Sequence, residues 1–301
     1  MIDIDSAVIN FSQTSLMVLN ASLGVVMFGV ALDLKIVDFR RLLQTPKPVL
    51  VGVFSQFVAL PCLTFVLVWL SAPQASIALG LILIAACPGG NVSNFFSHRA
   101  AGNTALSVSL TSLATVLAVV MTPLNLSFWG SLYPPSAELV LNTRLDPVQM
   151  ALTLLILLIL PMAAGIALNE RQHALAVKLK RPIQSFSLVF FGVFVLAALL
   201  GNWQNFKSYV SLVFVLVLAH NLLALITGLS LAKLAGLSRT DQRTVTLETG
   251  IQNSGLGLVL IFSFFDGLGG MAVIAAWWGI WHIIAGFTAA QLFRASDGRP
   301  A

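Results

Sequence analysis

The sequence predicts an all-α polytopic membrane protein with nine transmembrane helices, and three observations support this fold class. Hydrophobic residues make up 58% of the 301-residue chain and charged residues only 9%, whereas soluble domains carry about 25% charged residues. The mean hydropathy is +0.94. Apolar runs long enough to cross a bilayer as helices recur throughout the chain. Their length and lack of alternation exclude barrel strands.

Nine such runs follow one another, separated by short polar gaps. The expected spans cover residues 13–32, 47–70, 75–98, 103–128, 147–168, 182–200, 209–234, 243–265 and 267–294. Proline, glycine and polar residues interrupt the third and eighth spans. No basic segment precedes the first run, so no cleavable signal peptide is expected and the first run is expected to span.

Lys and Arg residues are distributed unequally between the two ends of these spans. Fourteen of the 16 lie in the gaps after the first, third, fifth and seventh spans or in the C-terminal tail, and only Arg144 and Lys207 lie on the opposite side. The positive-inside rule therefore predicts a multi-pass protein of the cell (inner) membrane, with its N-terminus outside and its C-terminus in the cytoplasm. No basic run with interleaved aromatic residues indicates nucleic-acid binding.

The two interrupted spans occupy corresponding positions in the two halves of the chain. Residues 47–128 and 209–294 each contain three spans, and in each triplet the middle span carries the break. The predicted orientation makes the triplets inverted copies of each other. Interrupted helices at matching positions of inverted repeats are typical of secondary transporters that bind their cargo at the bilayer midplane.

The first break carries an unusual set of residues, Pro88-Gly89-Gly90 followed by Asn91, Ser93 and Asn94. Proline and glycine disfavour a helix interior, and freed backbone groups cost several kcal/mol each in lipid. A half-helix N-terminus suits an anion, and the exposed carbonyls of the preceding half-helix suit a cation. Pro88 alone would be read as a plain kink. The whole set, with its partner break, favours a binding site.

Glu248 is the only one of the eleven acidic residues that lies inside a run. A carboxylate at that depth costs about 2.5–3.5 kcal/mol on insertion scales, so it predicts a functional site. No Lys or Arg is expected deep in a run, which leaves a proton or a bound cation as compensation. Neutral oxygen ligands nearby favour an alkali cation, with Na⁺ the physiological candidate; they are Gln56, Ser93, Asn94, Ser107, Thr111 and Gln252. Ser107 and Thr111 on their own would be read as helix-packing residues.

Two further residue types leave alternatives open. His282 lies in the middle of the last run, where a structural histidine bonded to a carbonyl and a substrate contact are both compatible with the sequence. The two cysteines, Cys62 and Cys87, both lie inside apolar runs. Neither a disulfide framework nor a cysteine metal site is expected.

The motifs "CPGGNVSN", "AAGNTALSVSLTS" and "LETGIQNSGLG" resemble those of the bile acid:sodium symporter family, as do "VVMFGVALDL" and "QFVALP". The resemblance covers about residues 25–293. It implies a core domain at about 75–128 and 209–294, a panel domain at about 13–70 and 147–200, and two broken helices that cross in the core.

The resemblance also implies two sodium sites and a substrate site. The first sodium site would use Ser93, Asn94, Ser107, Thr111 and Glu248. The second would use the side chains of Gln56, Glu248 and Gln252 with the backbone carbonyls of Thr249 and Ile251. Substrate would contact Asn91, Asn253 and His282.

The chain departs from the bacterial pattern of this family in three ways. It has nine expected spans rather than ten, Asn91 where bacterial relatives often have Thr, and Ile283 after His282 where Asn can occur. The last two changes affect the substrate side. The expected function is a sodium-coupled symporter that imports an organic anion by alternating access, either bile-acid-like or a small carboxylate such as pantoate or a 2-oxo acid. Its expected partners are sodium, substrate and lipid, with no obligatory protein partner.

Two other functions compete with symport. An exporter of anions or metalloids with a related two-break fold could use Cys87 as a thiol ligand. An intramembrane protease could use Ser254 and His282 as a dyad, but "QNSGLG" is not a GxSxG nucleophile elbow, and Glu248 would have no role. The expected protein is therefore a transporter rather than an enzyme.

Overall fold

The computed structural model describes residues 4–5, 12–37, 46–143, 146–201 and 203–296, and its regular secondary structure there is helical. The helices in the first half are α1 (Gln13–Ala31), α3 (Pro46–Phe54), η1 (Ser55–Ala59), α4 (Leu60–Ser71), α5 (Ala75–Ala86), α6 (Val92–Arg99), α7 (Thr104–Leu132) and α8 (Pro134–Asn142). Those in the second half are α9 (Pro147–Leu154), η2 (Leu155–Ile159), α10 (Leu160–Arg171), α11 (His173–Gly201), α12 (Trp203–Leu234), α13 (Arg239–Gly250), α14 (Ser254–Phe264) and α15 (Gly269–Ala295).

Six helices in the described part of the chain are long and apolar enough to cross a membrane. They cover Gln13–Ala31, Pro46–Ser71, Thr104–Leu132, Pro147–Arg171, Val213–Leu234 and Gly269–Ala295. Two shorter apolar helices, α5 and α14, belong to the interrupted spans. The structure is therefore that of a polytopic helical membrane protein, while the total of nine crossings stays a prediction.

Every expected span lies on one to three of these helices, with the largest difference in its bounds at the sixth. That span was expected to start at Pro182, but α11 begins at His173 and contains the proline in its interior. The preceding turns carry Lys and Arg and are too polar to belong to an apolar run. Proline removes only one backbone donor, so a long helix can continue through it when the surroundings compensate. The short helix α8 was not expected.

Two wide π-helical turns, η1 and η2, interrupt the second and fifth spans. Each is followed by a proline at the second position of the next helix, Pro61 or Pro161. Leu60 N–H reaches back five residues to the Ser55 carbonyl, and Leu160 N–H does the same to Leu155. Because proline supplies no N–H and its ring crowds the preceding turn, the helix widens there. The first wide turn contains Gln56.

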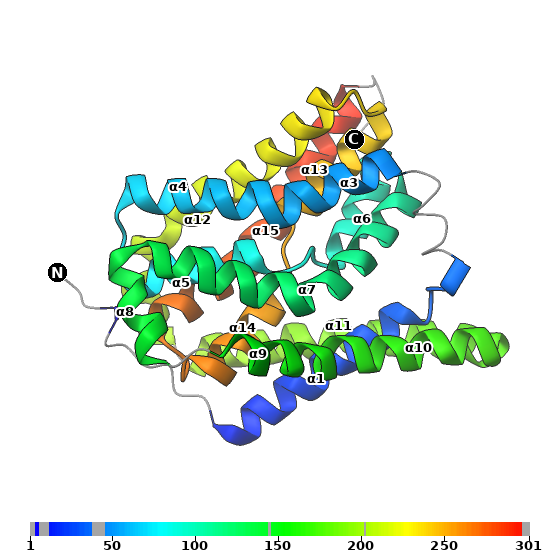
Figure 1. The fold of residues 1–301 in the computed structure, drawn as a ribbon. Coiled ribbons are helices and arrows are strands. Elements are labelled where there is room, and N and C mark those ends of the chain that lie inside the picture. The colour runs from blue at the N-terminus through cyan, green and yellow to red at the C-terminus, as the bar shows by residue number, and fades with distance from the viewer. Residues whose placement is uncertain (1–3, 6–11, 38–45, 144–145, 202, 297–301) are drawn as a thin grey trace.

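The helices form two groups in Figure 1. Helices α1, α10 and α11 pack against one another along one side of the molecule, and α5, α7, α12, α13 and α15 pack together on the other side. The segment α3–α4 contacts α5, α7, α12 and α13. Residues 46–71 thus contact helices that the family resemblance assigns to the core, although the same resemblance assigns about residues 13–70 to the panel. The division into core and panel stays a prediction.

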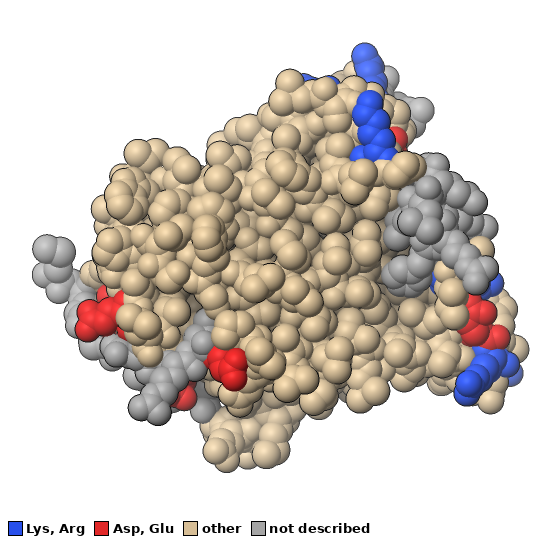
Figure 2. All heavy atoms as spheres, in the orientation of Figure 1, with Lys and Arg blue, Asp and Glu red and all other residues tan. Residues whose placement is uncertain are grey.

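Helix α5 lies at the centre of the main hydrophobic core. All twelve of its residues are buried, and it contacts α4, α7 and α15. A helix that is apolar on every side has no face for water, so its interior position follows from its sequence. On the face drawn in Figure 2, charged side chains lie towards the ends of the molecule and a broad uncharged surface separates them. This surface has the composition that a bilayer requires.

Candidate functional site: two broken helices around Glu248

Both predicted breaks are present, and the two breaks meet. Helix α5 ends at Ala86 and α6 begins at Val92, while α13 ends at Gly250 and α14 begins at Ser254. Gly90 N–H donates to the Ile251 carbonyl at 2.7 Å, and Asn253 N–H donates to the Pro88 carbonyl at 2.9 Å. The two extended segments therefore satisfy some of each other's freed backbone groups, as antiparallel strands do. This exchange reduces the cost of breaking two helices inside a membrane.

Glycine is required at Gly89 because of what lies beside it. A methyl group built there would overlap Oε1 of Glu248 and lie only 3.0 Å from its carboxyl carbon. The neighbouring Gly90 is similarly close, because an added methyl would lie 3.0 Å from the Gln252 carbonyl oxygen. The glycines allow the first break to lie directly against the acid and the second break.

The Glu248 carboxylate is buried, with 4% of the residue exposed, and accepts hydrogen bonds from three hydroxyl groups. Ser93 Oγ donates to Oε2 at 2.6 Å, Thr111 Oγ1 donates to Oε1 at 2.7 Å, and Ser107 Oγ donates to Oε2 at 3.3 Å. Thr111 Oγ1 also lies 3.2 Å from Asn94 Oδ1. The five residues that the resemblance assigns to the first sodium site therefore form one cluster from α6, α7 and α13.

Arg243 differs from what the sequence predicts. It was expected to lie in a polar gap, but it is part of α13 and only 6% exposed. Its Nη1 donates to the Ala100 carbonyl at 3.0 Å, and its guanidinium lies 5.7 Å from the centre of the Phe293 ring. It precedes Glu248 by five residues, roughly 7.5 Å along the helix axis. The polar contacts found for Glu248 are with neutral hydroxyls.

Of the residues assigned to the second sodium site, Gln56, Gln252 and Thr249 are hydrogen-bonded to one another. Gln56 Nε2 donates to Gln252 Oε1 at 2.8 Å, and Gln252 Nε2 donates back to Gln56 Oε1 at 3.1 Å. Gln252 Nε2 also donates to the Thr249 carbonyl at 2.7 Å. The Ile251 carbonyl accepts the bond from the other break described above. These oxygens could hold a cation, and both glutamine side chains are buried.

Two of the three predicted substrate residues, Asn91 and Asn253, lie at the two breaks, and the third, His282, lies on α15. Asn91 and Asn253 immediately precede α6 and α14. Asn253 Oδ1 caps α14 by accepting from Leu256 N–H at 3.0 Å, whereas Asn91 makes no side-chain capping bond. His282 is 6% exposed, and its Nδ1 has no hydrogen-bond partner within the described part of the chain.

A second buried histidine, His220, has a hydrogen-bond partner at each ring nitrogen. The sequence did not predict these partners. Trp278 Nε1–H donates to His220 Nδ1 at 2.9 Å, and His220 Nε2 lies 2.8 Å from Thr64 Oγ1. An indole nitrogen can only donate, so Nδ1 is the acceptor and the imidazole proton is on Nε2, directed at Thr64. The adjacent Asn221 Nδ2 donates to the Gly250 carbonyl at 2.7 Å. His220 thus connects α4, α12 and α15.

The geometry does not support the competing functions. The structure shows no hydrogen bond between Ser254 and His282, and the described His282 Nδ1 has no partner, so the protease dyad is not formed. The Cys87 thiol is fully buried in the main hydrophobic core. A buried thiol among apolar side chains is a packing group rather than a reactive ligand.

Comparisons with known proteins find sodium-dependent transporters that are similar to this chain over most of its length. The chain is 33% identical over 285 residues to the uncharacterized sodium-dependent transporter YocS of Bacillus subtilis, covering 93% of this chain and 85% of that protein. It is 31% identical over 277 residues to the probable sodium/metabolite cotransporter BASS1, chloroplastic, of Arabidopsis thaliana, covering 91% of this chain and 66% of that protein. It is 28% identical over 276 residues to a sodium-dependent organic anion transporter of Bos taurus, covering 85% and 71%. The family model of sodium bile acid symporters matches residues 21–209. The chain therefore belongs to the sodium bile acid symporter family, a family of membrane transporters rather than enzymes.

Proposed function

We propose that this protein is a sodium-coupled secondary active symporter that imports an organic anion by alternating access. The observation that carries the proposal is the buried Glu248 carboxylate, which three hydroxyl groups surround where two broken helices cross. A buried carboxylate with neutral oxygen neighbours is suited to a hard monovalent cation. The names of the relatives, which describe sodium-dependent transport or sodium/metabolite cotransport, support the same proposal.

Two sodium ions are proposed to bind beside Glu248. At the first site, the hydroxyls of Ser93, Ser107 and Thr111 would rotate so that their lone pairs face the ion, since a hydroxyl can both donate and accept. Asn94 Oδ1 would complete this set. The carboxylate supplies the negative charge that compensates the ion.

The second ion is proposed to compete with the pairing of Gln56 and Gln252. In the structure the two amides bind each other, which occupies both side-chain oxygens. An ion between them would take those oxygens together with the Thr249 and Ile251 carbonyls and Glu248. Sodium would thereby join the second span to the crossing and stabilise the arrangement that binds substrate.

The anion is proposed to bind at the N-termini of α6 and α14. The positive end of the helix dipole favours negative charge there. Asn91, Asn253 and His282 would orient the carboxylate or sulfonate. The substrate class is proposed to be bile-acid-like or a small carboxylate such as pantoate or a 2-oxo acid. The names of the plant and bovine relatives, which specify a metabolite and an organic anion, are compatible with both classes.

The proposed transport cycle moves a panel domain against the core. Nine spans, an inverted repeat, an outside N-terminus and a cytoplasmic C-terminus belong to this proposal. Two contacts of the structure support the repeat. Gln56 Nε2 donates to the carbonyl of Cys87, the residue after α5, and Asn221 Nδ2 donates to the carbonyl of Gly250, the last residue of α13. In both triplets, an amide of the first span thus binds a backbone carbonyl where the first half-helix ends.

Reconstituted vesicles with an imposed sodium gradient test the proposal. Purified protein is first screened by thermal shift with small carboxylates and bile salts, with and without sodium, because a bound ligand raises apparent stability. A labelled hit is then followed into vesicles. We expect inward sodium gradients to drive accumulation, and Glu248→Gln to abolish it while the protein remains folded. Accumulation by the wild type that ignores the sodium gradient would contradict the proposal.

A further inference from the structure

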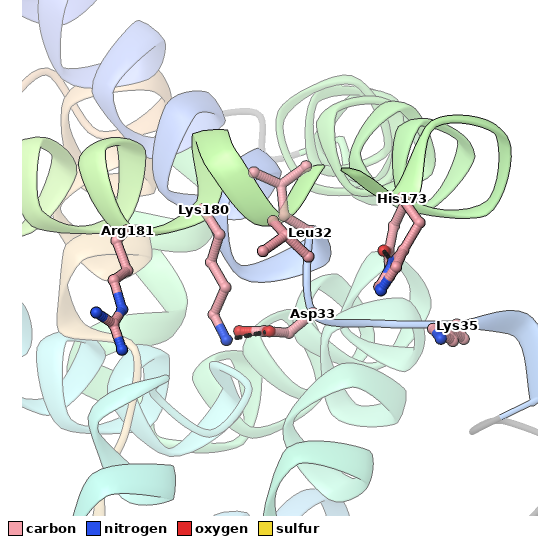
Figure 3. Close-up of a pocket in the computed structure, with 8 residues that line it drawn as sticks. Leu32, Asp33, Lys35, His173, Lys180 and Arg181 are labelled. Atoms are coloured by element: carbon pink, nitrogen blue, oxygen red, sulfur yellow. Dashed lines mark hydrogen bonds and ion pairs between the residues drawn. The ribbon is translucent and has the colours of Figure 1, made fainter. Parts of the chain in front are cut away.

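A cavity of about 430 Å³ opens at the ends of α1, α10 and α11, and it shares no residue with the site around Glu248. Its lining includes three basic side chains, Lys35, Lys180 and Arg181, with a single carboxylate, Asp33. Figure 3 shows the side chains that line it. The proposed transport mechanism gives this cavity no role.

One face of α11 builds half of the wall. His173, Val177, Lys180 and Arg181 all line the cavity, and their spacing of four, three and one residues places them on the same side of a helix. In Figure 3 the Lys180 side chain points to Asp33, which follows the end of α1. The basic positions immediately precede the apolar part of α11, which starts after Pro182.

The charge of the lining is positive. Lys180 Nζ forms an ion pair with Asp33 Oδ1, and Gln184 Nε2 donates to Asp33 Oδ2 at 3.1 Å. Both oxygens of the carboxylate are therefore engaged within the protein. Arg181 is exposed and forms no ion pair with another described residue. A guanidinium of this kind presents several N–H donors to an anion and suits phosphate oxygens in particular.

The position of the cavity favours a lipid headgroup over a free anion as its ligand. It lies where α1 has just ended and before the apolar part of α11 begins, which is the level of the lipid headgroups. Val177 lines it and is exposed, and Ile36, which follows Lys35 in the chain, is 55% exposed. Apolar side chains beside a basic pocket at this level can contact acyl chains while the bases contact the headgroup.

We propose that this cavity binds the phosphate-bearing headgroup of an anionic phospholipid. Arg181 contacts the phosphate, Lys180 adds positive charge while it remains paired with Asp33, and Val177 contacts the upper part of an acyl chain. The inference rests on the membrane location of the chain and is independent of sodium coupling or substrate.

The test uses the full-length protein in neutral detergent and compares Arg181→Gln with Lys178→Gln. Lys178 is exposed on the same helix and does not line the cavity, so it is a matched loss of charge. Each protein is titrated with phosphatidylglycerol, phosphatidylcholine or inorganic phosphate, and stabilisation is followed by thermal shift. We expect phosphatidylglycerol to stabilise the wild type and Lys178→Gln equally. Arg181→Gln should need about five-fold more phosphatidylglycerol for the same effect.

Other outcomes overturn the proposal. An equal loss in Arg181→Gln and Lys178→Gln would show attraction to general surface charge. Equal stabilisation by phosphatidylcholine would show a dependence on bilayer lipid of any charge, and full stabilisation by inorganic phosphate would identify a free anion. Arg181→Lys keeps the charge and should retain more of the response than Arg181→Gln, which provides a folded comparison if the glutamine variant is unstable.

Discussion

Replacing Ser93 with alanine tests the contact that holds the buried carboxylate. Ser93 Oγ donates to Glu248 Oε2 at 2.6 Å, which is the shortest of the three hydrogen bonds that the Glu248 carboxylate accepts from hydroxyl groups. Hydrogen bonds to charged groups contribute about 1.5–3 kcal/mol. If the same oxygen is also a sodium ligand, its loss should weaken sodium binding about ten-fold or more, since ten-fold corresponds to about 1.4 kcal/mol.

A matched control for Ser93→Ala is a serine one helical turn further along α6. Ser97 is also fully buried on α6, but its hydroxyl has no hydrogen-bond partner among the described residues. Ser97→Ala removes the same oxygen atom without removing a bond, so its stability should be unchanged or slightly higher.

Sodium titrations followed by thermal shift compare the two variants with the wild type. Both are expected to fold, with Ser93→Ala less stable without sodium and ten-fold weaker in its apparent sodium affinity. Ser97→Ala should keep the wild-type affinity within about two-fold, well below one 1.4 kcal/mol step. Equal sodium affinity in the two variants would refute the assignment of Ser93 to the sodium site.

Three further predictions follow from the same geometry. Gly89→Ala places a methyl group against the Glu248 carboxylate and should abolish sodium-dependent stabilisation, whereas Gly192→Ala, whose methyl would meet nothing within 4 Å, should retain it; retention by both would contradict the close approach. Gln252→Ala should lose sodium-driven uptake but remain folded, because Gln56 keeps its bond to the Cys87 carbonyl; wild-type uptake would exclude the second site. Cotransport of two sodium ions with one monoanion moves one positive charge inward per cycle, so uptake should slow on depolarisation; a voltage-independent rate would argue against this stoichiometry.

The spans and both breaks could be predicted because their signals are local. A run of apolar residues reports its length directly, and proline and glycine mark where a helix cannot continue. Glu248 could be singled out because one acid inside an apolar run needs a specific reason. The oxygen ligands around it were chosen by residue type, and the structure brings Ser93, Ser107 and Thr111 into contact with it.

Other features depend on packing between distant segments, which no local pattern contains. Arg243 was placed in a gap because charged residues usually remain in water, but the Ala100 carbonyl and the Phe293 ring give it a buried position. The contact of His220 with Trp278 joins residues 58 positions apart. The wide turn at Gln56 follows from Pro61, but its effect on the direction of the glutamine side chain depends on α5 and α13.

The two three-span repeats, residues 47–128 and 209–294, satisfy the backbone groups freed by their breaks in related ways. The difference between them bears on how the proposed sodium ion would act where the breaks meet. Each break leaves carbonyls at the end of a half-helix that must be satisfied inside a membrane. Asn221 satisfies the Gly250 carbonyl, which lies between the Thr249 and Ile251 carbonyls proposed for the second ion, and this contact stays within the second triplet. Gln56 satisfies the Cys87 carbonyl and also binds Gln252 in the opposite break. The Gln56 amide therefore connects both breaks, and an ion bound at its oxygen as proposed would change how the second span is held against them. The Asn221 amide contacts one break, so the proposed coupling of cation binding to movement between helices is expected to act through Gln56.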